Sequence, residues 1–390
     1  MHWYKEGEPD GRFIGNTKKY SIYGCHYNSS IESIHESLAE RKPEEFIFAY
    51  GPSTGGLMES VGLDILTPGE KISSISVDPN YKLRKIKVTG MSIQDALLRI
   101  ERINGFHSAS HSICFLRATE DALQIDVPDE VQFNRIAQIE TERIRSHLLV
   151  IQKLAESAGF GVPVNQISMI REKVSRIIGT QCGHRYFFAV NGVGNSGFMI
   201  DKLQVKLHEV IVDYRRIYEG LMESKLFLNR LQNNGINKDP ESTGPAARGS
   251  DIRHDARNEL PVLPYGILEF YPITRDEGDA FSRFMIRSDE IFQSFDLIKK
   301  IPKFVSNESM EFDLEKSSGT GMARIESPAG DLFYSVEIEN GKVVDVGMIS
   351  PSWRNVLSFR KSMVGNIFTD FHFNWESFGI WISELGVDLS

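Results

Sequence analysis

The spacing of apolar residues changes along the chain, and each change predicts a different kind of element. Up to about residue 88, short apolar stretches predict a small β-sheet that begins with the run FIFAY at 46–50. From Ser92 the apolar residues recur at intervals of three and four, which predicts an amphipathic helix. The same spacing over 130–157 predicts a long helix, with Asp129 as its N-cap.

Further along, helical spacing alternates with turn-forming residues. Helices are expected over 169–178, over 200–231 as one long helix, and over 276–300. The stretch 233–258, rich in Asn, Gly, Pro and Ser, is the best internal boundary. At 319–349, strand patterns flank Asn340-Gly341, a pair typical of a hairpin turn.

These patterns predict an α+β fold that is predominantly helical, with a central bundle of long helices. A small sheet precedes the bundle, and a β-hairpin unit lies near 320–350. We expect an N-terminal segment at 1–45, with a short helix near 30–41, and one large domain at 46–390. That domain divides into a β region (46–91), a helical core (92–232) and a C-terminal half (233–390). The residues expected to be buried are Leu97, Ile100, Ile139, Leu148, Leu154 and Leu226.

Composition narrows the classes of function. The formal net charge is −9 and no basic run offsets it, which argues against nucleic acid as a partner. The three cysteines are far apart and form no C-x-x-C pair, which argues against a disulfide framework or a self-contained metal cluster. No stretch is long and apolar enough for a membrane-spanning helix, and the N-terminus lacks the apolar part of a secretory signal. We therefore expect a soluble chain, or one held at a membrane by a partner.

Several motifs stand in a fixed order along residues 46–375. They are GPSTGG at 51–56, ERINGFHSASH at 101–111, ETERIRSHLL at 140–149, CGHRYFFAVNGVGNSG at 182–197, GPAARGSDIRHDARNELPVLPY at 244–265, GDAFSRFMIRSDEIFQS at 278–294, ESPAGDL at 326–332 and PSWRN at 351–355. In this order the motifs resemble those of the superfamily that joins the quinone-site subunit of complex I (the 49 kDa or D type) and the large subunits of group 4 membrane-bound NiFe-hydrogenases. The resemblance implies the long-helix bundle of that superfamily.

The chain departs from this superfamily where hydrogenases hold nickel. Active hydrogenases bind nickel with four thiolates from two C-x-x-C pairs. Here the first pair falls on Asn104 and His107, and the second falls near His372 and Trp375. These side chains supply no thiolate, so the resemblance implies a member without nickel and with no metal in this chain. Packing and hydrogen-bonding roles are favoured over a new metal site between His107 and His372.

The quinone-binding pattern of complex I is altered as well. In the resemblance, the two histidine positions of the glycine–proline turn fall on Thr54 and Met58, and the quinone-binding tyrosine falls on Gly105. The quinone-reducing set is therefore absent. Gly105 removes bulk rather than adding it, so Thr54, Met58 and Gly105 stay candidates for lining a quinone pocket.

The glycines at 192–197 do not follow a strand–glycine–helix unit, which argues against a dinucleotide loop.

Several cationic residues of the superfamily are retained. They are Arg102, Arg143, His147, His184 and Arg185. In the superfamily such residues line the face towards the small iron–sulfur subunit, where a guanidinium stabilises a reduced cluster. The equally weighted alternative is a salt bridge to Glu140 or Glu142 within the helix bundle. His107 and His111 also share one helix face, a spacing that suits a metal but is commoner among packed histidines.

The resemblance implies that four distant segments converge on one pocket, namely 51–56, 102–107, 143–147 and 370–375. The candidate pocket residues are Arg102, Asn104, His107, Arg143, His147, Asp370 and His372. Titratable groups that meet in a cleft are typical of a proton-coupled redox site. Two buried arginines would be costly without partners, so we expect carboxylates or an anionic or quinoid ligand beside Arg102 and Arg143.

Two functions remain open. The first is a redox subunit of a membrane-associated complex I-like complex, related to NADH-quinone oxidoreductase or energy-converting hydrogenase. The chain would lie between a small iron–sulfur subunit and the membrane arm, peripheral to the cytoplasmic side of the cell membrane, with a quinone as a candidate ligand and the iron–sulfur cluster in the partner. The second is a structural docking subunit of such a complex. The aromatic C-terminal run at 368–382 is expected to expose an apolar patch to partners, or alternatively to close the core.

Overall fold

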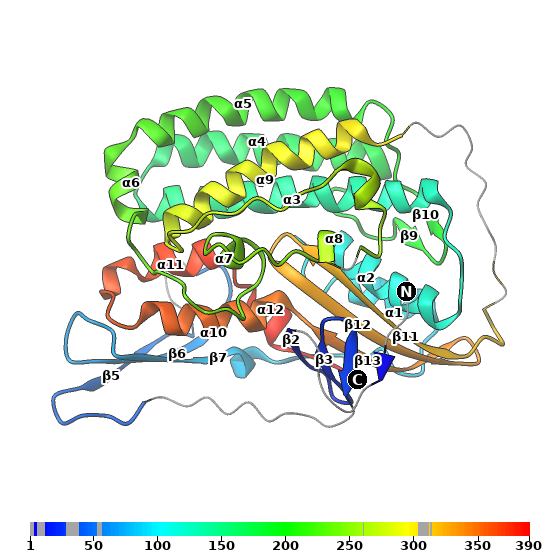
Figure 1. Cartoon of the computed structure of the whole chain (residues 1–390), viewed down its shortest axis with the longest axis horizontal. Helices are drawn as coiled ribbons and strands as arrows, with labels where there is room; N and C mark the ends of the chain where they lie inside the picture. Colours follow the sequence, from blue (N-terminus) through cyan, green and yellow to red (C-terminus); the bar gives the residue numbers. More distant parts are fainter. Residues whose placement is uncertain are drawn as a thin grey trace.

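Long helices form a layer over small β-sheets and shorter C-terminal helices in the computed structural model (Figure 1). The structure describes residues 4–5, 12–28, 39–52, 57–259, 261–302, 312 and 314–390. The helices are α1 (Ile93–Ile100), α2 (Ser108–Ala122), α3 (Asp129–Ser157), α4 (Gly161–Cys182), α5 (Leu203–Glu223), α6 (Lys225–Leu231), α7 (Gly244–Arg248), α8 (Ala256–Glu259), α9 (Ala280–Lys300), α10 (Pro351–Met363), α11 (Phe371–Phe378) and α12 (Ile382–Leu385). Single 3-10 turns are η1 (Pro79–Lys82), η2 (Tyr265–Leu268) and η3 (Phe368–Asp370). The predicted α+β class with a helical core is confirmed.

Helix α3 is the centre of the bundle. It packs against α4 and α9, and also contacts α2 and α11. Because neighbours surround it, its middle turns are buried on every side, including the charged residues of ETERIRSHLL. The long helix predicted at 130–157 is therefore confirmed, but Asp129 is its first helical residue, and Pro128 rather than Asp129 occupies the N-cap position.

The helix expected over 200–231 is two helices. Ser224 adopts an extended conformation between α5 and α6, and its side chain accepts a hydrogen bond from the backbone of Phe227, which caps α6. The break turns α6 about its axis relative to α5, so different positions face the core than in one continuous helix. Phe227 therefore points into the core, while Leu226 is 63% exposed, contrary to the prediction that it is buried. The other five leucine and isoleucine predictions are confirmed.

The sheets are small and mostly antiparallel. The three-stranded sheets are β5 (Phe46–Tyr50), β6 (Gly62–Thr67) and β7 (Ser74–Asp78), and β11 (Gly319–Ser327), β12 (Gly330–Glu339) and β13 (Lys342–Ile349). The N-terminal sheet has the order β1 (Tyr4–Lys5), β4 (His26–Asn28), β3 (Ser21–Tyr23), β2 (Phe13–Asn16). Two short pairs are β8 (Arg84–Ile86) with β14 (Val387–Leu389), and β9 (Asn191–Gly192) with β10 (Asn195–Ser196). Asn340 and Gly341 both have positive φ, which confirms the predicted hairpin turn between β12 and β13. The helix expected near 30–41 lies mostly outside the described residues.

The C-terminal aromatic run closes a core. Phe371, Trp375 and Phe378 of α11 pack with Phe359 of α10 and with apolar residues of β6 and β7. The prediction of an exposed apolar patch from this run is therefore wrong, because the aromatic rings fill the space between α10, α11 and the sheet. The stretch 233–258 is also largely buried and carries α7 and α8.

Candidate functional site

An ion cluster lies buried where α3, α7, α8, α9 and β11 meet. Arg143 contacts Glu140 at 3.2 Å and Glu290 at 3.8 Å, and it donates to the backbone carbonyls of Glu326 and Ser327. The expectation that Arg143 has carboxylate partners is confirmed. Of the two predicted partners, Glu140 is the one that pairs with Arg143.

Arg248 pairs with three carboxylates of this cluster. Its guanidinium lies 2.7 Å from both Glu290 and Glu326, and 3.0 Å from Asp255. Asp255 also pairs with Arg257, which extends the cluster to Glu140 at 3.3 Å. Burial raises the pKa of Glu326, and nearby Asp255 raises it further. At Glu290, Arg248 and His147 outweigh the effect of burial and hold the pKa well below its usual range.

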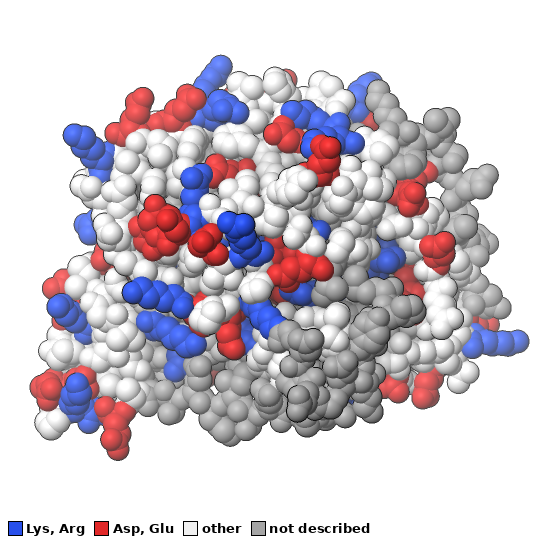
Figure 2. All heavy atoms as spheres, viewed as in Figure 1, with Lys and Arg blue, Asp and Glu red and all other residues white. Residues whose placement is uncertain are grey.

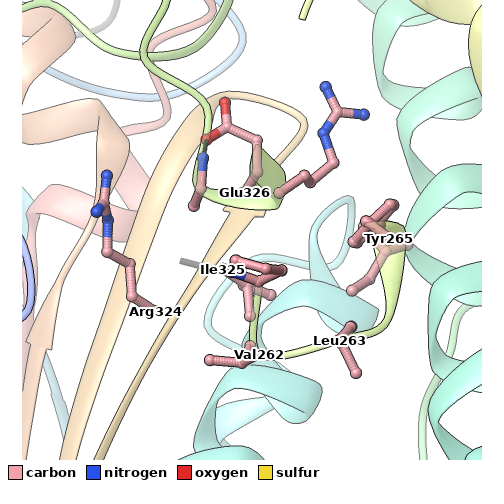
Figure 3. A pocket seen from close by; sticks show the side chains of 10 residues that line it. Val262, Leu263, Tyr265, Arg324, Ile325 and Glu326 are labelled. Carbon is pink, nitrogen blue, oxygen red and sulfur yellow. Dashed lines mark hydrogen bonds between the residues drawn. The ribbon is translucent and has the colours of Figure 1, made fainter. Parts of the chain in front are cut away.

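The cluster is closely packed. Figure 3 shows Ile325 turned towards Val262 and Leu263, with Tyr265 beside them and Glu326 next along the strand. The cavity between these residues has a volume of only about 10 Å³. A space of this size holds one water at most, so the cluster is a structural centre rather than a ligand site.

His147 lies at the edge of the cluster. Its Nε2 contacts Glu290 at 2.7 Å and its Nδ1 accepts from Arg287 at 3.1 Å. Burial lowers the pKa of His147 to about 3, against the opposing effect of Glu290. The imidazole is therefore neutral, and Arg143 and His147, which were predicted to share a pocket, share Glu290 instead.

A second buried group surrounds Asn104 and His107. The Asn104 amide donates to Glu384 at 2.9 Å, and Nδ1 of His107 lies 2.7 Å from the same carboxylate oxygen. Gly379 ends α11 with positive φ, and an added Cβ there would meet Arg287 at 2.4 Å. The glycine lets the chain turn so that α12 brings Glu384 to Asn104 and His107.

This geometry places a different segment opposite Asn104 and His107 than the sequence suggested. His372 bonds the hydroxyl of Tyr50 at 2.9 Å, and Asp370 lies 3.8 Å from Arg230 at the surface. Neither residue has a recorded bond to Asn104 or His107. The residue that converges with that pair is Glu384, because α12, and not the start of α11, packs there. Within the described ranges, no group of three or more His, Cys, Asp or Glu side chains is arranged to hold a metal ion.

The remaining predicted residues lie apart from these clusters. Arg102 is half-exposed and stacks over Phe188, so the expectation that it is buried is wrong. Its pairing with Glu101 confirms the expected carboxylate partner. An added Cβ on Gly105 would lie 3.8 Å from the Tyr186 ring, so this ring takes part of the space. Met58 is 39% exposed, and Thr54 lies outside the described residues. His184 and Arg185 are at the surface, where Arg185 pairs with Glu172.

Two arginines that the sequence analysis missed line a surface pocket. Arg145 is buried between the rings of Phe106 and Tyr186, and Arg171 also stacks on Phe106. Among the residues that the structure describes, no carboxylate lies within ion-pair distance of either guanidinium, and neither Nε has a hydrogen-bond partner. Burial and the neighbouring Arg145 lower the pKa of Arg171 to about 10. Arg145 lies two residues from both Arg143 and His147, so it must lie on a different face of the helix from them. This spacing could have indicated a second arginine site.

Glu376 was missed as well. It is almost completely buried on α11, and its Oε1 has no hydrogen-bond partner among the described residues. Burial raises the pKa of Glu376 to about 8, although Lys153 works in the opposite direction. The carboxyl is therefore mostly protonated at neutral pH. Its position in the aromatic run gave no signal, because a carboxyl there reads as an exposed helix residue.

The surface shown in Figure 2 carries positive and negative side chains interspersed, without a continuous field of one sign. In the described part of the chain, no helix is long and apolar enough to cross a membrane.

Comparison with known sequences gives consistent relatives. A profile of the family described as the 49 Kd subunit of respiratory-chain NADH dehydrogenase matches residues 159–316. The alpha subunit of the membrane-bound hydrogenase of Pyrococcus furiosus is 26% identical over 352 residues, covering 82% of each chain. The C/D subunit of the NADH-quinone oxidoreductase of Bacteroides thetaiotaomicron is 26% identical over 324 residues, covering 77% of this chain and 60% of that protein.

Comparison with solved structures supports the same fold. A chain of the membrane-bound sulfane sulfur reductase, an archaeal respiratory membrane complex, superposes with a TM-score of 0.80 at 19% identity, covering 87% of this chain and 98% of that one. This chain thus shares the fold of that solved chain. The chain is therefore similar to complex I 49 kDa-type subunits and to membrane-bound hydrogenase alpha subunits, in agreement with the order of its motifs.

Proposed function

We propose that this chain is a subunit of a membrane-associated, complex I-like electron-transfer complex and does not carry nickel. It lies between an iron–sulfur subunit and the membrane arm, on the cytoplasmic side of the cell membrane. The relatives named above are subunits of hydrogenases and quinone oxidoreductases, which supports this role. A quinone is the proposed small ligand, with Thr54, Met58 and Gly105 as candidate neighbours.

The observation that carries the proposal is the pocket at Arg145 and Arg171. Its volume is about 200 Å³, and Ser168, Glu172, Ser175 and Arg185 also line it, with Glu172 paired to Arg185. Arg145 is buried and Arg171 partly buried without a carboxylate partner among the described residues, an arrangement that favours a docked partner bringing negative charge. An iron–sulfur cluster held by thiolates in a docked subunit has that charge and gains from nearby cations.

A second surface supports a membrane-side partner. Strand β5 is an edge strand of its sheet, and Phe46, Ile47 and Phe48 are each at least 40% exposed. An unpaired edge with consecutive exposed apolar residues favours a protein partner. We assign this strand to the membrane-arm contact, in place of the C-terminal aromatic run.

The test uses the native complex and a matched pair of variants on α4. Arg171→Gln removes a pocket cation, whereas Arg176→Gln removes an arginine that is 75% exposed on the same helix. We expect the first to weaken retention of the iron–sulfur subunit by about tenfold and the second to leave it unchanged. Equal retention in both variants would contradict the docking of that subunit at this pocket.

The alternative is a docking subunit without chemistry. It is favoured by the hydrogen bonds that Asn104, His107 and Ser352 already make to Glu384. Glu376→Gln discriminates between the two roles. It keeps the shape of the side chain but removes a carboxyl that can release a proton, which a redox role would use and a docking role would not. Loss of electron transfer in a normally assembled complex supports the redox role, and unchanged electron transfer supports docking alone.

A further inference from the structure

Two imidazoles face one carboxylate oxygen inside the protein. Oε1 of Glu384 lies 2.7 Å from Nδ1 of His107 and 3.5 Å from Nε2 of His111, one helical turn further along. All three side chains are buried, and Nε2 of His111 has no hydrogen-bond partner in the described structure. We propose that His107, His111 and Glu384 form a proton-binding site that exchanges its proton with solvent through an adjoining polar pocket.

The other ring nitrogens are held in a way that permits two protonation states. Nε2 of His107 pairs with the hydroxyl of Ser146 at 3.0 Å, and Nδ1 of His111 pairs with the hydroxyl of Tyr334 at 2.8 Å. A hydroxyl either donates or accepts by rotating, so neither imidazole loses a hydrogen bond when it gains a proton. His147 differs, because Arg287 only donates and therefore holds that ring neutral.

Charge at the site favours one added proton. His107 and His111 outweigh the effect of burial and hold the pKa of Glu384 well below its usual range, so the carboxylate is ionised. A buried carboxylate without a cation is strongly unfavourable, and a proton on either imidazole supplies that cation. Other charged or titratable groups that contact the segments of the site are Glu59, Arg84, Glu142, Arg145 and Tyr334. Arg145 donates to the backbone carbonyls of Gly105 and Phe106 rather than to Glu384.

None of these neighbours replaces the proton. Arg84 donates to the backbone carbonyls of Ile103 and Ser383 rather than to Glu384. Glu59 accepts from the backbone of Ile382 and Ser383, and it adds negative charge on the same side as Glu384. The imidazoles are therefore the groups placed to neutralise Glu384.

A pocket of about 310 Å³ adjoins this site, and the Glu384 side chain beside it is only 1% exposed, so the proposed exchange requires a small opening between the pocket and the carboxylate. Glu384 lines the pocket together with Asn16, Met348, Ile349, Ser350, Trp353, Leu385 and Val387. At about 30 Å³ per water, the volume holds on the order of ten waters. In the proposed exchange, a hydronium ion in the pocket gives its proton to the carboxylate, which passes it to an imidazole. One O–H bond of the hydronium breaks, one N–H bond forms, and a water molecule remains in the pocket.

The binding of this proton is a property of the chain itself, and its use in electron transfer rests on the proposed function. The test is therefore hydrogen–deuterium exchange at the imidazole C2 position, followed by mass spectrometry of the native complex over a range of pH. This exchange depends on the protonation state and solvent access of each histidine. His147 is an internal control, since it is equally buried but held neutral.

We expect His107 or His111 to show a pH-dependent exchange profile that His147 lacks. Glu384→Gln should shift this profile to lower pH by about one unit or more, because an opposite charge stabilises the imidazolium. Val387→Phe narrows the pocket and should slow exchange at the same histidines severalfold without affecting His147. This second variant keeps the proposal testable if Glu384→Gln does not fold.

Three results would overturn the proposal. The first is a profile for both histidines that is unchanged by either variant. The second is exchange at His107 and His111 as silent as that of His147. The third is a stoichiometric metal ion in the purified complex that is lost on His111→Phe. The two proposals can fail separately. The docking role is tested by retention of the iron–sulfur subunit in Arg171→Gln, and the proton-binding site by the exchange profiles of His107 and His111.

Discussion

Arg287 donates a hydrogen bond to Nδ1 of His147 over 3.1 Å, while Nε2 of the same ring contacts Glu290 at 2.7 Å. A guanidinium has no acceptor, so Nδ1 must be the unprotonated nitrogen and the proton must lie on Nε2. Two neighbours thus fix both the tautomer and the charge of a buried histidine, without help from a metal or ligand.

The first prediction concerns the stability contributed by His147. Burial lowers its folded pKa to about 3, so below an unfolded pKa of about 6.5 only the unfolded chain takes up this proton. Stability is therefore present above that value and lost as pH falls towards 3. We expect wild type to lose about 2 kcal/mol more than His147→Gln between pH 7 and pH 5 in urea unfolding. His208→Gln, at an exposed position, should behave as wild type; equal slopes for all three proteins would contradict the prediction.

Glu376 should show the opposite dependence. Its folded pKa is raised to about 8 by burial, so the folded chain holds a proton that the unfolded chain releases above about pH 4.5. Stability is full at low pH and is lost as pH rises through 8. Relative to Glu376→Gln, we expect wild type to lose about 3 kcal/mol between pH 5 and pH 8. Glu209→Gln, at an exposed position on α5, is the control, and a Glu376→Gln protein that tracks wild type at every pH would refute protonated Glu376.

Helix packing is tested by two leucines. Leu154→Ala empties a fully buried site on α3 and should reduce the free energy of unfolding by about 3–5 kcal/mol. Leu226→Ala, at a position that is 63% exposed, should change it by less than about 0.5 kcal/mol. Chemical denaturation measures both. Similar losses would mean that Leu226 is covered, as the sequence suggested.

Arg143 should act as a structural residue. Arg143→Met leaves Glu140 and Glu290 short of a buried cation, and we expect a loss of about 3–5 kcal/mol in the free energy of unfolding. Arg176→Met, on the exposed face of α4, should cost less than about 1 kcal/mol. Thermal unfolding of the two variants measures these losses. An Arg143→Met protein that is as stable as wild type but loses electron transfer would show that Arg143 has a functional rather than a structural role.

The last prediction is the metal content. Asn104, His107 and Glu384 supply no thiolate, and thiolates are the ligands that nickel requires in active relatives. Elemental analysis of the natively purified protein should find no nickel in proportion to this chain. About one nickel per chain would refute this prediction.

The sequence predicted the fold well where periodicity is strong. The spacing within 130–157 and the Asn340-Gly341 pair each depend on local chemistry, and both are confirmed. The break at Ser224 escaped prediction because the apolar spacing continues through it, and only the capping bond to Phe227 reveals it. Burial also limited the prediction, since a charged run such as ETERIRSHLL reads as a solvated face until surrounding helices cover it.

The site was predicted less completely for a different reason. Asn104, His107 and Arg143 were found because they stand in local motifs. Glu384 was missed because the matching segment was placed at 370–375, and no property of the sequence states which C-terminal turn packs against Asn104. That choice depends on the path of the chain after Gly379, which is a property of the folded molecule.

The buried ion cluster has a consequence for how the chain folds. Arg143 and Glu326 are joined by a bond although 183 residues separate them in sequence, and Arg248 bridges segments from both halves. Such contacts close long loops, which slows the search for the native arrangement. Until every segment arrives, each carboxylate and guanidinium stays hydrated, and dehydrating an incomplete set is unfavourable. We therefore expect this cluster to close among the last steps of folding.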